Sequence, residues 1–147
     1  AIAKVVADAI SMGYRLIDTA ACYQNEDGVG DAVRTCGIPR EELLVTSKVW
    51  NTDRGYDKTM VAFETSLKLL GMEYLELYLI HWPANAVYSR NWESVNRSTW
   101  SALSELYKKQ KVRAIGVSNF KPKHLEALMT MDVQPMVNQI EIHPGSS

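Results

Sequence analysis

The sequence predicts an α/β fold in which parallel strands alternate with helices, as in a (β/α)8 TIM barrel. Five short apolar runs begin near residues 14, 43, 75, 112 and 136, and separations of 24 to 37 residues fit a strand followed by a helix. The runs are apolar rather than alternating, which is typical of strands covered on both faces. Polar residues suited to chemistry follow these runs at or near their ends, and such residues converge in space only if the strands are parallel.

The size of the chain limits how much of a barrel it can form. It has 147 residues, of which 46% are hydrophobic, and this is enough apolar material for one core. A complete eight-stranded barrel needs about 250 residues. We therefore expect residues 1–147 to be a single partial TIM-barrel domain with about five consecutive strand–helix units, in which the first strand and the last two strands are missing.

Charge and composition exclude several classes of function. The net charge is −1 and the two signs are mixed along the chain, so nothing favours a nucleic-acid surface. No apolar run has membrane-spanning length, so no membrane partner is expected. The two cysteines, Cys22 and Cys36, fit a reducing compartment better than a disulfide scaffold, and a cytoplasmic location is the default expectation. No metal-ligand spacing stands out.

The first two units are bounded by glycine. Residues Ala1–Met12 form an amphipathic segment, and Gly13 stands where the end of a helix needs a left-handed residue. Tyr14–Asp18 is then predicted to be a short buried strand. Asn25 is expected to cap the next helix, because two acidic residues suited to the positive end of the helix dipole follow it. Gly37 and the proline two residues later end that helix.

The middle units repeat the same order. The second and third strands are predicted at Leu43–Lys48 and Leu75–Ile80, each a short apolar run. Between them, Asp57–Leu70 has the length of a helix and is followed by Gly71 in the C′ position. The middle of the chain therefore continues the alternation of strand and helix.

In the last part of the chain, helical periodicity and a proline indicate where the helices lie. Residues Arg97–Gln110 are predicted to be a helix because large apolar side chains recur on one face at helical spacing, namely Trp100, Leu103 and Tyr107. Val112–Val117 is predicted to be the fourth strand. A helix opened by Pro122 follows, since proline suits the first turn of a helix. The fifth strand is expected around Met136–Ile142.

Residues with catalytic or binding chemistry follow the strands in an ordered series. They are Asp18 and Tyr23 after the first strand, Lys48 at the end of the second, His81 after the third, Ser118 and Asn119 after the fourth, and Gln139 in the fifth. Residues that follow parallel strands at the same end converge in space, so this series predicts one site.

Five motifs carry a resemblance to a known family. They are Asp18-Thr-Ala with Tyr23 and Asn25-Glu26 behind it, Val45-Thr-Ser-Lys48, Leu79-Ile-His-Trp-Pro83, Gly116-Val-Ser-Asn-Phe120, and Asn138-Gln-Ile-Glu-Ile-His-Pro144. In this order and spacing the chain resembles the aldo-keto reductase family over essentially its whole length. The bacterial and protozoan members of the diketogluconate-reductase or prostaglandin-F-synthase type are the most similar subgroup.

The resemblance implies NADPH-dependent reduction of aldehydes and ketones to alcohols, with NADH as a possible substitute for NADPH and a small carbonyl compound as substrate. Reduction of a carbonyl by a hydride builds negative charge on the oxygen, so a proton donor must reach that oxygen. Tyr23 is the predicted donor. An ordinary phenol has a pKa of about 10, and a neighbouring cation such as Lys48 makes its proton more available.

The other residues have supporting roles. Asp18 would orient Lys48, and His81 would hydrogen-bond the carbonyl. The remaining roles come from the family alone. Three residues would hold the nicotinamide carboxamide, and two aromatic residues would line the substrate pocket: Ser118, Asn119 and Gln139 for the first role, Trp50 and Trp82 for the second.

Two other interpretations of the whole chain stay open. The chain could be an inactive open sheet with a bare apolar face, which associates with another copy or with a complementary fragment. It could also be a regulatory subunit that resembles the same reductases.

Several single residues have plainer interpretations. A tyrosine or tryptophan near a strand end more often packs than catalyses, and an Asp–Lys pair is most often structural. Cys22 suggests a nucleophile, but no sequence feature supplies a base to activate it, so a small pocket-lining residue is favoured. His124 is predicted to face solvent on its helix, and His143 to end the last strand. Gly28-Val-Gly30 is predicted to lie inside a helix and not in a phosphate loop.

Overall fold

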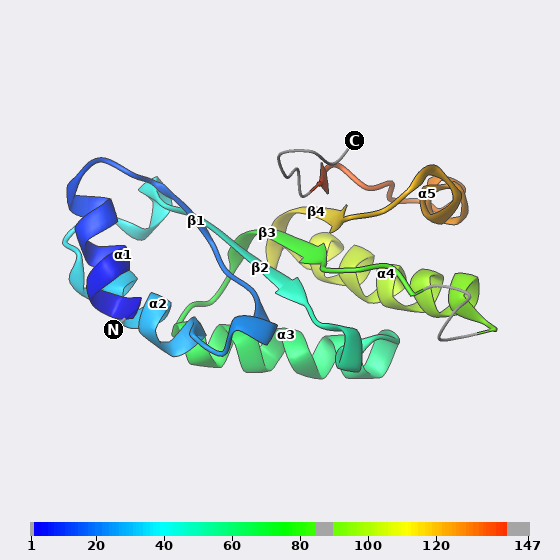
Figure 1. The fold of residues 1–147 in the computed structure, drawn as a ribbon, viewed down its shortest axis with the longest axis horizontal. Coiled ribbons are helices and arrows are strands. Elements are labelled where there is room, and N and C mark those ends of the chain that lie inside the picture. The colour runs from blue at the N-terminus through cyan, green and yellow to red at the C-terminus, as the bar shows by residue number, and fades with distance from the viewer. Residues whose placement is uncertain (1, 85–89, 141–147) are drawn as a thin grey trace, which may run out of the picture.

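The sheet has five parallel strands that follow one another in chain order. The computed structural model describes residues 2–84 and 90–140. Within these ranges the strands are β1 (Leu16–Asp18), β2 (Leu44–Val49), β3 (Leu75–Ile80), β4 (Val112–Ser118) and β5 (Asn138–Gln139), and they lie in the order β1-β2-β3-β4-β5 (Figure 1). Every neighbouring pair is parallel. The predicted α/β fold with consecutive parallel strands is confirmed.

Each strand is connected to the next through helical segments. The helices are α1 (Ile2–Ser11), α2 (Glu26–Thr35), α3 (Tyr56–Leu70), α4 (Trp92–Lys108) and α5 (Pro122–Met129), with short 3-10 turns η1 (Ala21–Tyr23), η2 (Arg40–Glu42) and η3 (Asn51–Asp53). Figure 1 shows α3 and α4 running along one side of the sheet, where they contact each other. None of the described helices is long and apolar enough to cross a membrane.

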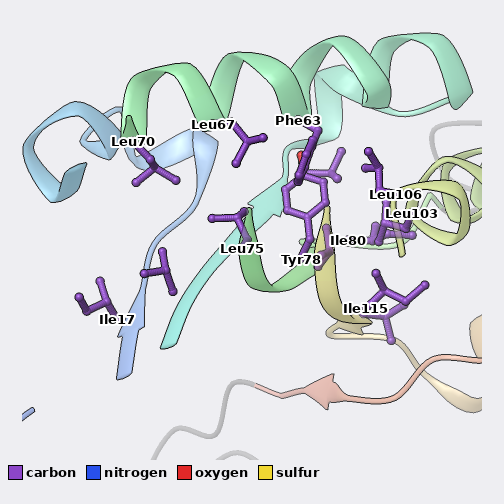
Figure 2. Packing of buried hydrophobic residues seen from close by; sticks show 14 of the residues in the cluster. Ile17, Phe63, Leu67, Leu70, Leu75, Tyr78, Ile80, Leu103, Leu106 and Ile115 are labelled. Atoms are coloured by element: carbon purple, nitrogen blue, oxygen red, sulfur yellow. The ribbon is translucent and has the colours of Figure 1, made fainter. Parts of the chain in front are cut away.

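The core lies between this helical layer and one face of the sheet. Successive side chains of a strand point to opposite faces, and one set of them turns toward the helices: Ile17, Val45, Tyr78, Ile80, Ile115 and Val117. Figure 2 shows Phe63, Leu67 and Leu70 pointing from α3 toward the strands. The Phe63 and Tyr78 rings meet edge to face with centroids 5.0 Å apart. Because this core is continuous, we propose that residues 1–147 form a single partial-barrel domain.

The opposite face of the sheet carries the polar site and an apolar border. Asp18 and Lys48 belong to this face, since they alternate with the buried Ile17 and Val49. On β1 and β2 the same face presents two leucines that pair in register, Leu16 and Leu44, which are 65% and 50% exposed. The apolar border therefore adjoins the polar end of the strands.

The predicted bounds of the strands with long apolar runs agree with the structure to within a residue. The predicted bounds of shorter strands and of one helix differ from the observed ones. The third strand lies at the predicted Leu75–Ile80, whereas the first begins at Leu16 and the fifth spans only Asn138–Gln139 within the described residues. Helix α4 begins at Trp92 rather than at Arg97. In this added turn the Asn96 amide bonds both the N–H and the C=O of Ala84, at 2.9 and 3.1 Å, so tertiary contacts extend the helix.

Glycine ends two helices as expected, but the predicted capping bond is wrong. Gly13 and Gly71 have φ angles of +107° and +67°, which residues with a Cβ rarely adopt. Asn25 occupies the position before α2 and makes no side-chain cap. Its Oδ1 instead accepts a hydrogen bond of 2.8 Å from the Thr19 hydroxyl. The side chain therefore fixes the loop that carries Tyr23.

Candidate active site

The residues predicted for proton transfer and cofactor binding lie at the carboxyl ends of strands or in the loops that follow them. Asp18 ends β1, Tyr23 lies in η1, Lys48 lies near the end of β2, His81 directly follows β3, Ser118 ends β4 with Asn119 next to it, and Gln139 ends β5. Because all the strands are parallel, these ends meet at one edge of the sheet. A groove of about 650 Å³ that includes Lys68, Lys111 and Arg113 lies at the opposite, amino-terminal end, away from these residues.

A buried ammonium group connects the first two strand ends. Lys48 is only 2% exposed, and its Nζ donates to Asp18 Oδ1 at 2.5 Å and to the Thr19 carbonyl at 3.2 Å. A buried charge needs such partners, because desolvation without them costs several kcal/mol. The same Nζ lies 5.6 Å from the centroid of the Tyr23 ring. Tyr23 itself is 49% exposed, so its ring is accessible from solvent while the cation behind it is not.

His81 lies among aromatic rings at the end of β3. Its imidazole meets the Tyr23 ring edge to face at 5.8 Å and the Trp50 ring at 5.2 Å, and it lies parallel to the Trp82 ring at 6.4 Å. The backbone carbonyl of His81 accepts a hydrogen bond of 3.3 Å from the Asn119 amide. The imidazole is buried, and its ring plane is defined by neighbours from three loops.

Two amides and a hydroxyl form a second group at the ends of β4 and β5. The Asn119 amide donates to Ser118 Oγ at 3.1 Å, and Ser118 Oγ donates to the Gln139 carbonyl at 3.1 Å. Asn119 has a φ of +61°, a conformation that asparagine tolerates better than most residues. The Gln139 amide donates to Asp18 Oδ2 at 3.0 Å. This last bond connects β5 to β1 across the curled sheet and joins the amide group to the Asp18–Lys48 pair.

The two predicted pocket tryptophans lie beside His81, and an arginine holds their loops. Trp50 follows β2, and Trp82 follows His81 with 37% of its surface exposed. Arg54 Nη2 donates to the carbonyls of Trp82 and Pro83, at 3.0 and 2.8 Å, and to Asn51 Oδ1 at 3.1 Å. Arg54 was not predicted from the sequence, because no motif indicates an arginine whose partners are backbone carbonyls of another loop.

Cys22 has a partner that the sequence did not reveal. Its Sγ lies 3.6 Å from His81 Nδ1. Burial raises the pKa of the Cys22 thiol, and the Lys48 charge opposes that change only in part. The adjacency of Cys22 to Tyr23 was the only signal that could have drawn attention to this residue.

The prediction that His124 faces solvent is wrong. His124 is 5% exposed, and its Nδ1 accepts a 3.0 Å bond from the backbone N–H of Lys121 at the start of α5. The Trp92 and Phe120 rings pack edge to face on its imidazole at 5.5 and 5.7 Å.

The remaining predictions concern single residues outside this cluster. His143 lies outside the described residues. Gly28 and Gly30 lie inside α2, as predicted, and no group of residues in the described ranges could hold a metal ion.

The chain matches one protein family over nearly its whole length. The model of the aldo/keto reductase family matches residues 2–146. The chain is 54% identical over 143 residues to the 9,11-endoperoxide prostaglandin H2 reductase of Trypanosoma cruzi, which covers 97% of this chain and 48% of the relative. It is 55% identical over 137 residues to the glyoxal reductase of Bacillus subtilis, which covers 92% of this chain and 47% of the relative. The chain thus spans about half the length of the relatives it matches.

Solved structures agree in fold. The aldo/keto reductase of Brucella melitensis superposes with a TM-score of 0.89 at 44% identity, over 97% of this chain and 54% of that one. The aldo-keto reductase of Bombyx mori, solved in complex with NADP, superposes with a TM-score of 0.83 at 35% identity, over 98% of this chain and 50% of that one. The match to the family model over nearly every residue, together with the order of the strand-end residues, shows that this chain belongs to the aldo/keto reductase family.

Proposed function

We propose that the chain carries the proton-transfer and nicotinamide-binding part of an NADPH-dependent carbonyl reductase that converts aldehydes or ketones to alcohols. The observation that carries the proposal is the buried Lys48 ammonium, held by Asp18 and placed behind the half-exposed Tyr23 ring. A structural ion pair has no need of a solvent-exposed phenol on one side. Proton donation to a substrate does need one.

In the proposed mechanism the Tyr23 hydroxyl donates a proton to the carbonyl oxygen of the substrate as the carbon is reduced. The Lys48 ammonium then stabilises the negative charge left on the phenol oxygen. Asp18 keeps the ammonium in place through its 2.5 Å bond. His81 is proposed to donate a hydrogen bond to the same carbonyl oxygen and so orient it, while Trp50 and Trp82 form the apolar wall of the substrate pocket beside the imidazole.

The donor set at the ends of β4 and β5 fits a nicotinamide. A carboxamide has both a donor and an acceptor, and the Asn119 and Gln139 amides and the Ser118 hydroxyl offer both kinds of group. These residues are proposed to hold the carboxamide of NADPH, which would supply the hydride. The complex of the Bombyx mori relative with NADP supports this choice of cofactor. NADH is the alternative that the same residues would accept.

For the substrate, small aldehydes, ketones and dicarbonyl compounds are the first candidates. The name of the Bacillus subtilis relative, glyoxal reductase, supports a small dicarbonyl. The purified chain should consume NADPH only when such a carbonyl compound is present. A folded sample that consumes no NADPH with any of these compounds would contradict the proposal for this chain.

The decisive variant is Tyr23→Phe. It removes only the hydroxyl, and loss of a proton-transfer group typically lowers turnover by about 10²- to 10⁴-fold. We expect a loss of that size in carbonyl-dependent NADPH consumption, measured by absorbance. Tyr14→Phe is the matched control, because Tyr14 is an exposed tyrosine just before β1, at the other end of the sheet. If turnover by Tyr23→Phe equals that of the control, Tyr23 is not the proton donor.

A further inference from the structure

Arg54 connects the two loops that carry the tryptophans of the proposed substrate pocket. Trp50 leads into η3, which Arg54 directly follows, while Trp82 and Pro83 belong to the loop after β3. Arg54 Nη2 donates to the carbonyls of Trp82 and Pro83, at 3.0 and 2.8 Å. The same nitrogen donates to Oδ1 of Asn51, the residue after Trp50, at 3.1 Å. One terminal nitrogen therefore joins residues that lie 28 and 29 positions apart in the sequence.

The backbone on either side of Arg54 is fixed, so its side chain extends from a rigid base. Before it, the backbone N–H of Asp53 donates to the Trp50 carbonyl at 3.0 Å. After it, the backbone N–H of Gly55 donates to the Thr99 hydroxyl of α4 at 2.8 Å. Arg54 is therefore fixed relative both to Trp50 and to α4.

The loop after β3 is anchored at its two ends by other groups. The backbone N–H of His81 donates to a carbonyl of β2 at 3.1 Å, and the side chain of Asn96 on α4 bonds the backbone of Ala84. Arg54 anchors the two residues between these ends. Without its guanidinium, their backbone carbonyls would have no protein donor within the described residues.

The guanidinium keeps its charge in this half-buried place without a carboxylate in contact. None of the ion pairs among the described residues includes Arg54, and its Nε is buried without a hydrogen-bond partner. Burial lowers the pKa of Arg54, because desolvation disfavours the charged form. An arginine that turned to solvent would avoid this cost. The bonds to the two carbonyls therefore outweigh it, as hydrogen bonds from a charged donor are stronger than neutral ones.

We propose that Arg54 is a positioning residue that sets the separation of the Trp50 and Trp82 walls and so favours small carbonyl compounds over bulky ones. The proposal rests on the role proposed above for the two tryptophans. Both indoles contact the His81 imidazole, so a shift of either loop changes the space beside that ring. Arg54 acts through the two loops and is not itself required to touch the substrate.

The first test measures the surroundings of the tryptophans without using turnover. The chain has four tryptophans, so labelling with 5-fluorotryptophan gives four ¹⁹F NMR signals, which single Trp→Phe variants assign. Arg54→Met keeps an apolar stem of similar bulk and removes every donor. We expect Arg54→Met to shift or broaden the signals of Trp50 and Trp82. The signal of Trp100, which is fully buried in the core, should stay unchanged and shows that the variant is folded.

The second test compares the KM values for a small and a bulky carbonyl compound, namely glyoxal and benzaldehyde. When the Trp82 loop relaxes, the walls contact a small molecule less closely, and this loss of binding raises KM with little change in kcat. We expect Arg54→Met to raise the ratio of the KM for glyoxal to the KM for benzaldehyde by roughly three- to tenfold. Arg113→Met is the matched control, because it removes an arginine at the opposite end of the sheet. It should leave the ratio unchanged.

The two measurements separate positioning from packing. If only the stem of Arg54 mattered, Arg54→Met would match the wild type in both tests. The ratio of KM values does not depend on the fraction of active protein, so a general loss of stability would not change it. The proposal is overturned if Arg54→Met leaves the Trp82 signal unchanged, or if its KM ratio equals that of Arg113→Met.

A second variant keeps the proposal testable if Arg54→Met does not fold. Arg54→Lys retains the charge, but its ammonium ends one atom short of the position of Nη2, so we expect changes in the same direction. Because the NMR signals are independent of turnover, failure of this proposal is distinguishable from failure of the proposed function. Shifted Trp50 and Trp82 signals in a chain without reductase activity would support the positioning role of Arg54 and contradict only the activity.

Discussion

At the scale of single residues, the site depends on charges that are satisfied from several strands. Lys48 is buried with two oxygen partners, while the Asp18 carboxylate is shared between Lys48 and Gln139. Asp18 therefore connects the residues proposed for proton transfer with the amide group at the ends of β4 and β5. A change at Gln139 would act on Lys48 through Asp18, although the two side chains come from strands far apart in the sequence.

His124 provides a prediction about pH at the residue scale. Burial lowers the pKa of its imidazole, and the charges of Lys123 and Lys121 lower it further. The folded-state pKa thus lies below the unfolded value of about 6.5. Above about pH 6.5 His124 is neutral in both the folded and the unfolded chain, and the free energy of unfolding has its full value. As the pH falls from about 6.5 toward the folded-state pKa, the unfolded chain binds the proton first, and the free energy of unfolding decreases.

The measurement is urea denaturation at about pH 7.5 and about pH 5.5. His124→Gln keeps a side-chain acceptor for the backbone N–H of Lys121, since glutamine suits this third helical position. We expect the midpoint urea concentration of the wild type to fall more between the two pH values than that of the variant. Equal decreases in both proteins would show that His124 does not account for acid destabilisation.

At the scale of elements, α2 is held against its neighbours by a buried carboxylate. Glu26 begins the helix and is 3% exposed. Its two oxygens accept hydrogen bonds of 2.7 Å from Ser47 of β2 and 3.0 Å from Ser66 of α3. One residue therefore fixes a helix, a strand and a second helix relative to one another. Glu26 lies three residues after Tyr23, so the same contacts restrain the loop that presents the phenol.

Two glycines in α2 give a prediction with an internal control. A Cβ on Gly30 would overlap the backbone of Leu70 at the end of α3, whereas the atom closest to a Cβ on Gly28 would be a side-chain methyl of Ile2, the first residue of α1, and the backbone of Ala3 would be at ordinary contact distance. Both changes to alanine gain roughly 0.5–1 kcal/mol in helix propensity. We expect Gly30→Ala to lower the free energy of unfolding by about 1–3 kcal/mol through overpacking. Gly28→Ala should be near neutral or stabilising.

Thermal and urea unfolding of the two variants check this prediction. Because both residues lie in the same helix, propensity alone predicts the same sign for both substitutions. A stabilised Gly30→Ala would mean that α2 and α3 can move apart at no cost. That result would contradict the close approach of the two backbones.

At the scale of the whole molecule, the described part of the chain is a curled sheet with helices along one side. The apolar side chains on the other side include Leu16 and Leu44, and further exposed apolar residues lie near β5, among them Met136 and Ile140. Exposed apolar surface of this kind is typical of an interface. Within the described residues, β1 and β5 each pair with a single neighbouring strand, so their outer edges offer backbone groups for pairing.

We expect the 147-residue chain to self-associate through this face in solution. The variant with both Leu16→Lys and Leu44→Lys places charges on the paired leucines and should shift the mass measured by light scattering toward the monomer. Val61→Lys is the control, because Val61 is an equally apolar residue, 67% exposed on α3. A wild-type chain that stays monomeric at all concentrations would contradict the prediction.

The sequence by itself determined the order of the strands, the parallel sheet and the identity of the strand-end residues. Apolar runs at regular separations predict strand–helix units, and residues that follow such runs must meet at one edge. The regular positions of Asp18, Lys48, His81 and Gln139 along the chain therefore predicted that these candidate residues lie at one edge of the sheet, as they do in the structure. The same reasoning placed Gly13 and Gly71, because a left-handed backbone is a local property that glycine permits.

Only the tertiary structure determined which side chains and backbone groups each of these residues contacts. The buried surroundings of His124, the bond of Asn25 to Thr19, and the contact of Cys22 with His81 all involve groups brought together by packing. Secondary-structure propensity is a local property of one segment. It does not determine which side chain from another loop will lie beside that segment. For this reason the sequence indicated candidate site residues, while only the folded chain showed which of their nitrogen, oxygen and sulfur atoms lie close together.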